Sequence, residues 1–493
     1  MDQKPLLERG QTCWRIEHAD RMRVIVDGAD FFRAAKAAML QAQHTIMLIG
    51  WDFDTRIKLE PEGATLAGPN TLGEFLAWLP EQADGLQIYM LKWDFGAVQS
   101  VGRGMLPVFI TDILTTDALH FRLDAEHPLG AAHHSKIVVI DDSVAFCGGI
   151  DMTEERWDTS EHRDQNPHRV TVGGEPSKPW HDATTIVDGG VAEALGDLAR
   201  ERWRRATGET LTPPPSHHSI WPDDLVPTLR DIPIGIARTF PDFDGYGEVR
   251  EIEAFYLEVI AAAQDILYIE TQYLASRCMV EAIKSRLAEE DGPEIIVILP
   301  RKSEGWLRRK AMDGARYHLL HELWEADRYG HFGAFYPVTA AGVAIYVHAK
   351  VLIADGRALR VGSSNLNNRS MGFDTECDLI VDAAVAPDKA DAVREAALSV
   401  RRTLVCEHLG IVDAQLDAAL EEADGSLLGA LRLLIHDGRS LRAFTPEEIE
   451  EDQSIMTNNA FADPEAAEGF GGRVFDGVGD LVNGLVGGES AER

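Results

Sequence analysis

Two short segments of the 493-residue chain carry the same reactive side chains. The first contains His134 and Lys136, and the second contains His348 and Lys350. Residues two apart in a β-strand project from the same face, so each segment presents an imidazole beside an ammonium group. Two such pairs together could exchange a phosphodiester, because one imidazole attacks phosphorus, the other donates a proton, and the ammonium groups neutralise the phosphate oxygens.

These segments belong to an internal repeat. The sequence HSKIVVID at 134–141 matches HAKVLIAD at 348–355, and GGID at 148–151 matches GSSN at 362–365. One offset of 214 residues (348 − 134) relates both matches. The repeat predicts two similar lobes that each supply half of one site. Its non-catalytic positions are expected to form strand ends and turns: Asp141, Asp355, Gly148, Gly149 and Gly362.

Helical stretches alternate with apolar strands in both halves, as in AAKAAMLQAQHTIMLIGW at 34–51 and EAFYLEVIAAAQDILYIETQ at 253–272. This pattern predicts an α/β protein with two pseudo-symmetric lobes, each a mixed sheet sandwiched by helices. The predicted units are a first lobe at 1–211, a Pro-rich linker at 212–227, a second lobe at 228–410, a helical extension at 411–443 and an acidic, mobile tail at 444–493.

Composition narrows the class of protein. The net charge of −34 repels phosphate backbones, so nucleic acid is not an expected partner. No secretory signal or membrane-spanning run is apparent, which predicts a cytoplasmic or peripheral membrane protein, with export without a cleaved signal left open. Five widely spaced cysteines without a CxxC pair indicate neither a disulfide framework nor a zinc site.

The motifs resemble those of the phospholipase D superfamily over most of residues 35–410. HHSKIVVIDDSVAFCGGIDMTEERWDTSEHR and the later PWHD resemble the first catalytic region of the eukaryotic-type enzymes. YIETQY and YVHAKVLIADGRALRVGSSNLNNRSM resemble their second region. No segment of this sequence resembles the regulatory lipid-binding modules of the eukaryotic enzymes, so regulation by those modules is not expected.

The resemblance implies a metal-free, cofactor-free reaction in two steps through a phosphohistidine. It favours His134 as the nucleophile and His348 as the general acid, although the symmetry of the repeat leaves this order open. It implies that Lys136, Lys350 and Asn365 hold the phosphate, and that a carboxylate further along each half orients the histidine there. These carboxylates are Asp182 for the first half and Glu376 for the second.

Further residues are expected to line the substrate site: Gln272, Ser363, Trp157 and Asp158. Gln272 is favoured over Glu270, whereas His133, His162 and Trp180 are left undecided.

The resulting hypothesis is a monomeric phospholipase D that acts on a phospholipid surface and releases phosphatidic acid. An acidic protein is repelled by an anionic leaflet, which favours a zwitterionic substrate. A cardiolipin-synthase-type phosphatidyltransferase, a metal-independent nuclease and a non-catalytic phosphate-binding protein remain as alternatives. The head group, the acceptor and the role of the tail are not fixed by the sequence.

Overall fold

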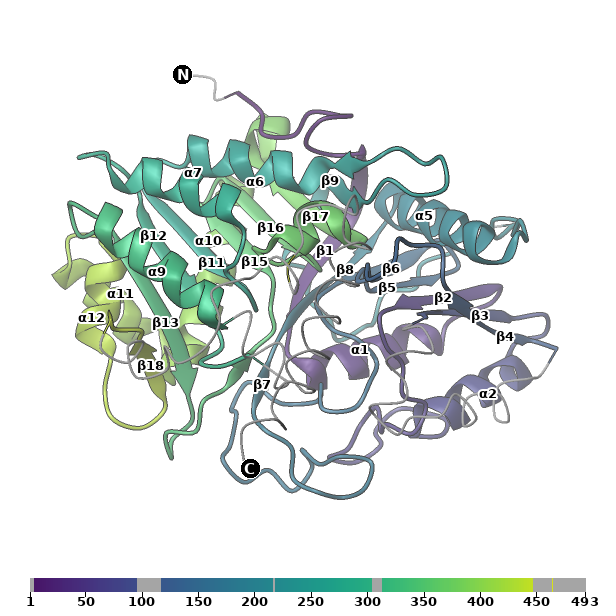
Figure 1. The fold of residues 1–493 in the computed structure, drawn as a ribbon. Coiled ribbons are helices and arrows are strands. Elements are labelled where there is room, and N and C mark those ends of the chain that lie inside the picture. Colours follow the sequence, from purple (N-terminus) through teal and green to yellow (C-terminus); the bar gives the residue numbers. More distant parts are fainter. Residues whose placement is uncertain (1–3, 95–116, 216–217, 304–312, 447–462, 464–493) are drawn as a thin grey trace, which may run out of the picture.

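The computed structural model describes residues 4–94, 117–215, 218–303, 313–446 and 463. A mixed, 16-stranded sheet runs through both halves of the molecule, with helices on its two faces (Figure 1). This architecture confirms the predicted α/β class and its two-lobed arrangement. The sheets of the two lobes are nevertheless one continuous sheet, which the sequence did not predict.

The strands of the first half are β1 (Arg15–Val26), β2 (Thr45–Gly50), β3 (Gln87–Trp93), β4 (Leu119–Asp124), β5 (Ile137–Ile140), β6 (Val144–Gly148), β7 (Trp180–His181) and β8 (Ala183–Asp188). Those of the second half are β9 (Leu229–Phe240), β10 (Val249–Arg250), β11 (Ile266–Glu270), β12 (Glu294–Ile298), β13 (Phe332–Val338), β14 (Tyr346–Val347), β15 (Val351–Ala354), β16 (Ala358–Gly362), β17 (Glu376–Asp382) and β18 (Ser440–Ala443).

The α-helices are α1 (Gly28–Met39), α2 (Leu72–Gln82), α5 (Gly190–Thr207), α6 (Glu251–Ala262), α7 (Arg277–Leu287), α9 (Gly314–Ala326), α10 (Ala390–Leu409), α11 (Asp413–Glu422) and α12 (Leu427–Leu434). Short helices of other types are η2 (Arg369–Phe373), η3 (Ala383–Val385) and η4 (Pro387–Lys389).

The pseudo-symmetry is visible in the strand order. Outward from the centre, the first half runs β1-β8-β6-β5-β2-β3-β4 and the second runs β9-β17-β16-β15-β11-β12-β13. The two central strands pair antiparallel, from Arg15 opposite Ile236 to Met22 opposite Leu229. This pairing fixes the lobes against each other, because a β-ladder allows little sliding once one face is buried.

Helices cover both faces of the sheet. On one face, α5 and α10 pack on a core that is shared by the two lobes. On the other face, α1 and α2 cover the first lobe, while α6, α7 and α9 cover the second. Both α5 and α10 end at a glycine in the left-handed region, Gly208 at φ 77° and Gly410 at φ 65°. A residue with a side chain would be strained at these positions, so the two glycines end the helices.

The C-terminal region differs in part from the expectation. The predicted helical extension contains α11 and α12, but it ends in β18, which pairs antiparallel with β13 at the edge of the sheet. Most of the predicted acidic tail lies outside the described residues. Among the described helices, none is both long and apolar enough to cross a bilayer.

Candidate active site

The two HxK segments meet where the lobes meet. His134 and Lys136 directly precede β5, and His348 and Lys350 directly precede β15. The backbone N–H of His134 donates to the carbonyl oxygen of Thr375 in the second lobe, with an N···O distance of 2.9 Å. Reciprocally, the N–H of His348 donates to the carbonyl oxygen of His181 in the first lobe at 2.8 Å. Both segments are therefore held by the opposite lobe.

Each imidazole binds a carboxylate of the other lobe. His134 Nδ1 lies 3.0 Å from both oxygens of Glu376, and His348 Nδ1 lies 2.6 Å from Asp182 Oδ2. The sequence predicts that each carboxylate orients the histidine of its own half, so that pairing is corrected here. The backbone bonds give the reason, because Glu376 follows Thr375 and Asp182 follows His181.

Glu376 is held rigidly. The hydroxyl of Ser363 donates to its Oε2 at 2.5 Å, and the hydroxyl of Ser370 donates to its Oε1 at 2.6 Å. Burial raises the pKa of Glu376 to about 7, against the opposing effects of Lys136 and these hydroxyls. Burial also raises the pKa of Asp182 above its ordinary value. Two fixed carboxylates thus set the orientation of the rings.

The surroundings of both rings favour the neutral imidazole. Burial, together with the charges of the neighbouring lysines, holds the pKa of His134 and of His348 well below the ordinary value. With the Nδ1 proton directed at a carboxylate, the Nε2 lone pair of each ring is available for attack or for accepting a proton.

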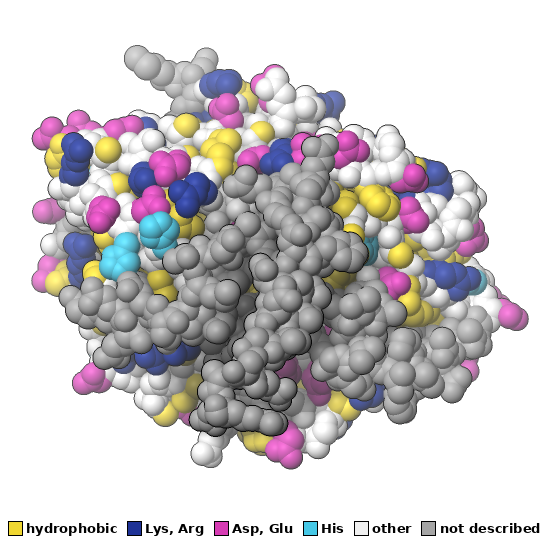
Figure 2. Space-filling view, in the orientation of Figure 1, with side chains coloured by type: hydrophobic (Ala, Val, Ile, Leu, Met, Phe, Trp, Pro, Cys, Tyr) yellow, Lys and Arg dark blue, Asp and Glu magenta, His cyan; other side chains and the backbone are white. Residues whose placement is uncertain are grey.

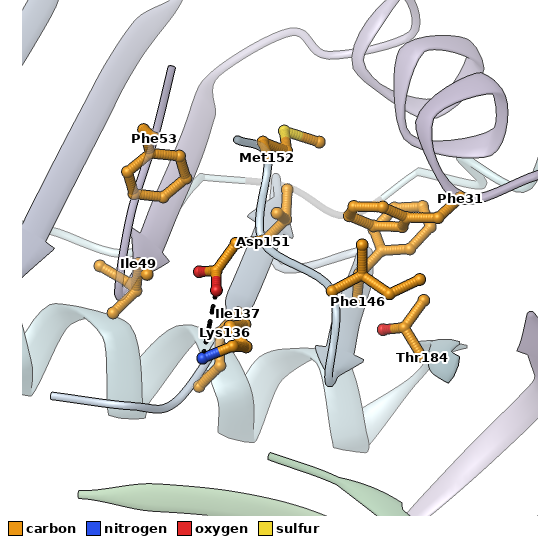
Figure 3. A pocket seen from close by; sticks show the side chains of 12 residues that line it. Phe31, Ile49, Phe53, Lys136, Ile137, Phe146, Asp151, Met152 and Thr184 are labelled. Carbon is orange, nitrogen blue, oxygen red and sulfur yellow. Dashed lines mark ion pairs between the residues drawn. The ribbon is translucent and has the colours of Figure 1, made fainter. Parts of the chain in front are cut away.

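The two lysines have different surroundings. Lys136 Nζ donates to the carbonyl oxygen of His134 at 2.6 Å and pairs with Asp151 Oδ2 at 3.3 Å, beside a small cavity lined mainly by apolar side chains (Figure 3). Lys350 Nζ donates to the carbonyl oxygen of His348. Burial lowers the pKa of Lys350 to about 7. An anion between the lobes would stabilise both ammonium groups.

Asn365 occupies in the second lobe the position that Asp151 occupies in the first. Its Oδ1 accepts from the backbone N–H of Gln272 at 3.2 Å, and the Gln272 side chain donates from Nε2 to the Tyr346 hydroxyl at 2.9 Å. Gln272 is therefore linked to the catalytic region through Asn365 and Tyr346. Glu270, by contrast, binds His181 and His408 in the interior.

An aromatic wall stands beside His348. The rings of Trp180 and Tyr346 stack with centroids 4.7 Å apart, and Trp180 lies 5.0 Å from the His348 ring. The guanidinium of Arg156 lies 4.1 Å from the Trp180 ring, and Lys178 Nζ lies 4.3 Å from the Tyr346 ring. Cations thus lie over both aromatic rings, next to His348.

Three residues predicted to touch substrate have other contacts. Trp157 packs in the apolar core of the first lobe. The Asp158 carboxylate is fully buried and accepts from His162 at 2.9 Å, Arg169 at 2.9 Å and the backbone N–H of Trp180 at 3.0 Å. Ser363 orients Glu376. Asp158 and Ser363 thus have partners within the protein and Trp157 packs in the core, and contact of these three residues with substrate stays a prediction.

The motif aspartates lie at the far ends of β5 and β15. Asp141 accepts from the backbone N–H groups of Gln43, His44 and Thr45 at 2.6 to 2.8 Å. Asp355 accepts from those of Gln264, Asp265 and Ile266 at 2.8 to 2.9 Å. Both carboxylates therefore fix the entry into the neighbouring strand, β2 or β11, and touch neither imidazole.

The motif glycines permit close packing. A Cβ at Gly148 would collide with Thr184, and one at Gly362 would collide with Asp378. A Cβ at Gly149 would collide with the Asp182 carboxylate. Gly149 thus leaves room for the group that orients His348.

The sequence reasoning missed Ser370, Tyr346 and Arg156. The repeat offset pointed to Asp151 as the counterpart of Asn365, but its pairing with Lys136 was not inferred. Nothing in the spacing of Arg156 or Tyr346 signals that they meet at Trp180, because three separate segments bring them together.

Comparison with known proteins agrees with this geometry. Residues 38–220 match the family described as "Phospholipase D", and residues 256–396 match the family described as "Cardiolipin synthase, PLD-like domain". Phospholipase D alpha 1 of Vigna unguiculata is 24% identical over 76% of this chain and 63% of its own length. Phospholipase D alpha 2 of Oryza sativa subsp. japonica is 26% identical over 79% of this chain and 65% of its own length. The chain spans just under two thirds of these relatives.

Among solved structures, the phosphatidylserine synthase of Haemophilus influenzae Rd KW20 shares the fold, with a TM-score of 0.51 and 13% identity over 78% of this chain and 89% of that one. The two family matches fall on the two halves of the repeat, and each contains one HxK segment. The chain belongs to the phospholipase D superfamily and carries a catalytic core of the eukaryotic phospholipase D type.

Proposed function

We propose that the protein is a phospholipase D, which cleaves the distal phosphodiester bond of a glycerophospholipid and releases phosphatidic acid and the head-group alcohol. The observation that carries the proposal is the crossed arrangement of His134 with Glu376 and His348 with Asp182. It gives two separately oriented imidazoles at one lobe junction, as an in-line displacement at phosphorus requires.

In the first step, His134 Nε2 attacks phosphorus, a P–N bond forms, and the bond from phosphorus to the head-group oxygen breaks. His348 donates the proton that the departing alkoxide needs. Burial lowers the pKa of His348, so its Nε2 takes this proton from solvent as the phosphodiester anion enters, because a neighbouring anion favours the protonated ring. In the second step, His348 takes a proton from water, the oxygen attacks phosphorus, and the P–N bond breaks to restore His134.

Lys136 and Lys350 supply positive charge for the non-bridging oxygens, in a site where burial strengthens that interaction. Asn365 lies at the same junction and offers an amide to the phosphate. In this scheme, Glu376 and Asp182 act by keeping the Nδ1 proton of each ring in place.

A phosphatidyltransferase is the second candidate, because residues 256–396 match a family described as "Cardiolipin synthase, PLD-like domain". Both reactions share the phosphohistidine and differ in the acceptor of the second step. A nuclease is disfavoured by the charges. Acidic and basic side chains are intermixed over the described part of the face in Figure 2, and the net charge of −34 repels a nucleic-acid backbone.

Incubation of the full chain with mixed phospholipid vesicles and a short primary alcohol tests the proposal. The alcohol replaces water at the position beside His348, so phosphatidyl alcohol should appear at the expense of phosphatidic acid while total lipid consumption stays nearly constant. The matched tertiary alcohol, which is too crowded at its carbon, should divert much less product. Phosphatidic acid alone at every primary-alcohol concentration contradicts a covalent intermediate. Product that forms only with a lipid alcohol as acceptor favours the transferase.

A further inference from the structure

A second polar cluster lies behind the active site, in the interior between the lobes. Its four central residues are Asp27, His162, His181 and Glu407, and each is buried. One donor atom from each residue lies within 4.8 Å of the other three. Asp27 directly follows β1, His181 lies in β7, and Glu407 lies in α10 of the second lobe. The proposed reaction uses none of these four side chains.

We propose that this cluster is a structural metal site for a divalent cation of the zinc class, with one donor atom from each of the four side chains.

The distances between the donors fit such an ion. His181 Nδ1 lies 2.7 Å from Glu407 Oε1 and 3.4 Å from Asp27 Oδ1. His162 Nε2 lies 3.2 Å from Glu407 Oε1 and 3.7 Å from Asp27 Oδ2. Zinc bonds of 2.0 to 2.2 Å in a tetrahedron place neighbouring donors about 3.3 Å apart. With Asp27 Oδ2 as the donor of Asp27, the three distances within one donor set are 2.7, 3.2 and 3.7 Å, which lie around that value.

The outer nitrogen of each histidine is already fixed by another carboxylate. His162 Nδ1 binds Asp158 at 2.9 Å, and His181 Nε2 binds Glu270 at 2.8 Å. A carboxylate on the outer nitrogen is the usual support of a metal-bound imidazole, because it fixes the tautomer and directs the lone pair of the inner nitrogen at the ion. Both histidines of this cluster have that support.

One atom of the cluster lacks a partner without an ion. Asp27 Oδ2 is buried and accepts no hydrogen bond from the described residues, and His162 Nε2 at 3.7 Å is too distant to donate one. A buried carboxylate oxygen without a donor is costly. A cation at the centre of the four donors would satisfy it.

The charges also agree with a divalent ion. Asp27 and Glu407 supply two negative charges at the centre, whereas the Asp158 carboxylate is paired with Arg169 at 2.9 Å. Without an ion, both imidazoles would have to be protonated at both nitrogens to balance the carboxylates. A bound cation replaces those two protons, which leave to solvent, and the rings coordinate as neutral ligands. Two imidazoles and only four donors favour zinc over calcium or magnesium.

The site would position a residue of the active site. The backbone N–H of Asp27 donates to the carbonyl oxygen of Asp182 at 2.8 Å, and the N–H of Asp182 donates to Asp27 Oδ1 at 3.3 Å. Asp182 in turn orients His348. An ion that ties Asp27 and His181 to Glu407 of α10 would thus lock the first-lobe segment of the active site onto the second lobe, away from the reacting phosphate.

Metal analysis of the full chain tests the site without relying on activity. Protein purified without chelators is expected to hold about one zinc ion per chain, and zinc X-ray absorption of the unmodified protein should show nitrogen and oxygen ligands that include two imidazoles. Fewer than about one ion in ten chains, even after equilibration with excess Zn²⁺ and removal of the excess, overturns the proposal. The cluster would then be a network of histidinium ions and carboxylates.

Two neighbouring substitutions in α10 locate the ligands. Glu407→Gln removes a proposed ligand and should abolish zinc retention. His408→Gln is the matched control, because His408 Nε2 binds Glu270 at 2.8 Å on the outer side of His181 and is not in the proposed set. Retention by Glu407→Gln together with loss in His408→Gln would overturn the assignment in favour of His181, Glu270 and His408. Absorption data on the unmodified protein still decide the case where Glu407→Gln does not fold.

Discussion

Glu376 in the second lobe binds Nδ1 of His134 in the first, although the two residues are 242 positions apart in the chain. The backbone explains this pairing, because the N–H of His134 donates to the residue that precedes Glu376. Asp182 and His348 repeat the relationship in the opposite direction. Neither lobe therefore holds a complete catalytic pair, and each histidine depends on the other lobe for its orientation.

A substrate with an activated leaving group distinguishes the role of the His134–Glu376 pair from that of the His348–Asp182 pair. A lipid with an activated aryl leaving group needs no general acid, so the burst of aryl alcohol in the first turnover should be nearly normal in His348→Asn and Asp182→Asn. The same burst should fall by about 10²- to 10⁴-fold in His134→Asn and clearly in Glu376→Gln, because these residues form and orient the nucleophile. Rapid-quench measurement of the burst decides the pairing. If Asp182→Asn behaves like His134→Asn and Glu376→Gln like His348→Asn, the crossed assignment is contradicted.

The two histidines should act as one unit on natural phospholipid. His134→Asn and His348→Asn are each expected to remove nearly all turnover, and the double variant should be little slower than either single one. His318→Asn is the control, because its side chain is 67% exposed and, among the described residues, forms an ion pair with Glu322 on its own helix. Steady-state release of the head group provides the measurement. A single variant that keeps a tenth of the normal rate is incompatible with one shared site.

The rate should depend on pH through Lys350. Burial lowers the pKa of this lysine to about 7, so in the free enzyme it is charged below that pH and loses its proton above it. Because the charged form binds the phosphate, kcat/KM is expected to fall as the pH rises through about 7. Lys350→Arg keeps its charge over this range, so the fall of kcat/KM that Lys350 causes near pH 7 should be missing from its profile, although the absolute rate is lower. An unchanged alkaline limb in Lys350→Arg shows that another group titrates.

Asp141 should matter for stability and little for catalysis. Its carboxylate accepts three backbone N–H groups that lead into β2. Asp141→Asn keeps the shape but loses the charge and one acceptor oxygen, so the free energy of unfolding should fall by about 1 to 3 kcal/mol. Chemical denaturation and kcat for the folded fraction are the measurements. Asp355→Asn in the other lobe should give the same result, and a large loss of kcat at full stability would show a direct catalytic role.

Arg156 should influence the choice of head group. Its guanidinium already lies over Trp180, next to His348, where a quaternary ammonium would otherwise stack. Arg156→Gln is expected to raise the rate on phosphatidylcholine relative to phosphatidylglycerol by about 10-fold, because roughly 1 to 2 kcal/mol of cation competition is removed. Parallel assays on vesicles of the two lipids measure the ratio. An unchanged ratio places Arg156 outside the head-group site.

Much of this arrangement could be predicted from the sequence because the repeat is explicit. Two HxK segments at a constant offset predict two similar lobes and one shared site, and the alternation of helices with apolar strands predicts the α/β layers. The crossed pairing of carboxylates and histidines could not be predicted in the same way, because it depends on backbone hydrogen bonds between segments that are distant in the sequence. The bond from His134 to Thr375 has no local sequence signal.

The continuous sheet escaped prediction for a related reason. The pairing of β1 with β9 joins strands more than two hundred positions apart. Considered within its own lobe, each of these strands would be the edge strand of a separate sheet. The buried cluster was missed because its members are spread from Asp27 to Glu407 at no recognisable ligand spacing. His162 and His181 are recognisable as possible metal ligands only once the fold has brought the carboxylates next to them.

Trapping the intermediate tests the central claim most directly. In His348→Asn, an activated lipid with a radiolabelled phosphate should still react with His134, but the second step lacks its base, so labelled protein should accumulate to about one phosphatidyl group per chain. Peptide mapping under alkaline conditions, which preserve phosphohistidine, then locates the label. The account predicts label on His134 and none in the double variant His134→Asn with His348→Asn. Release of the aryl alcohol without any labelled protein, or label at a residue other than His134, would contradict it.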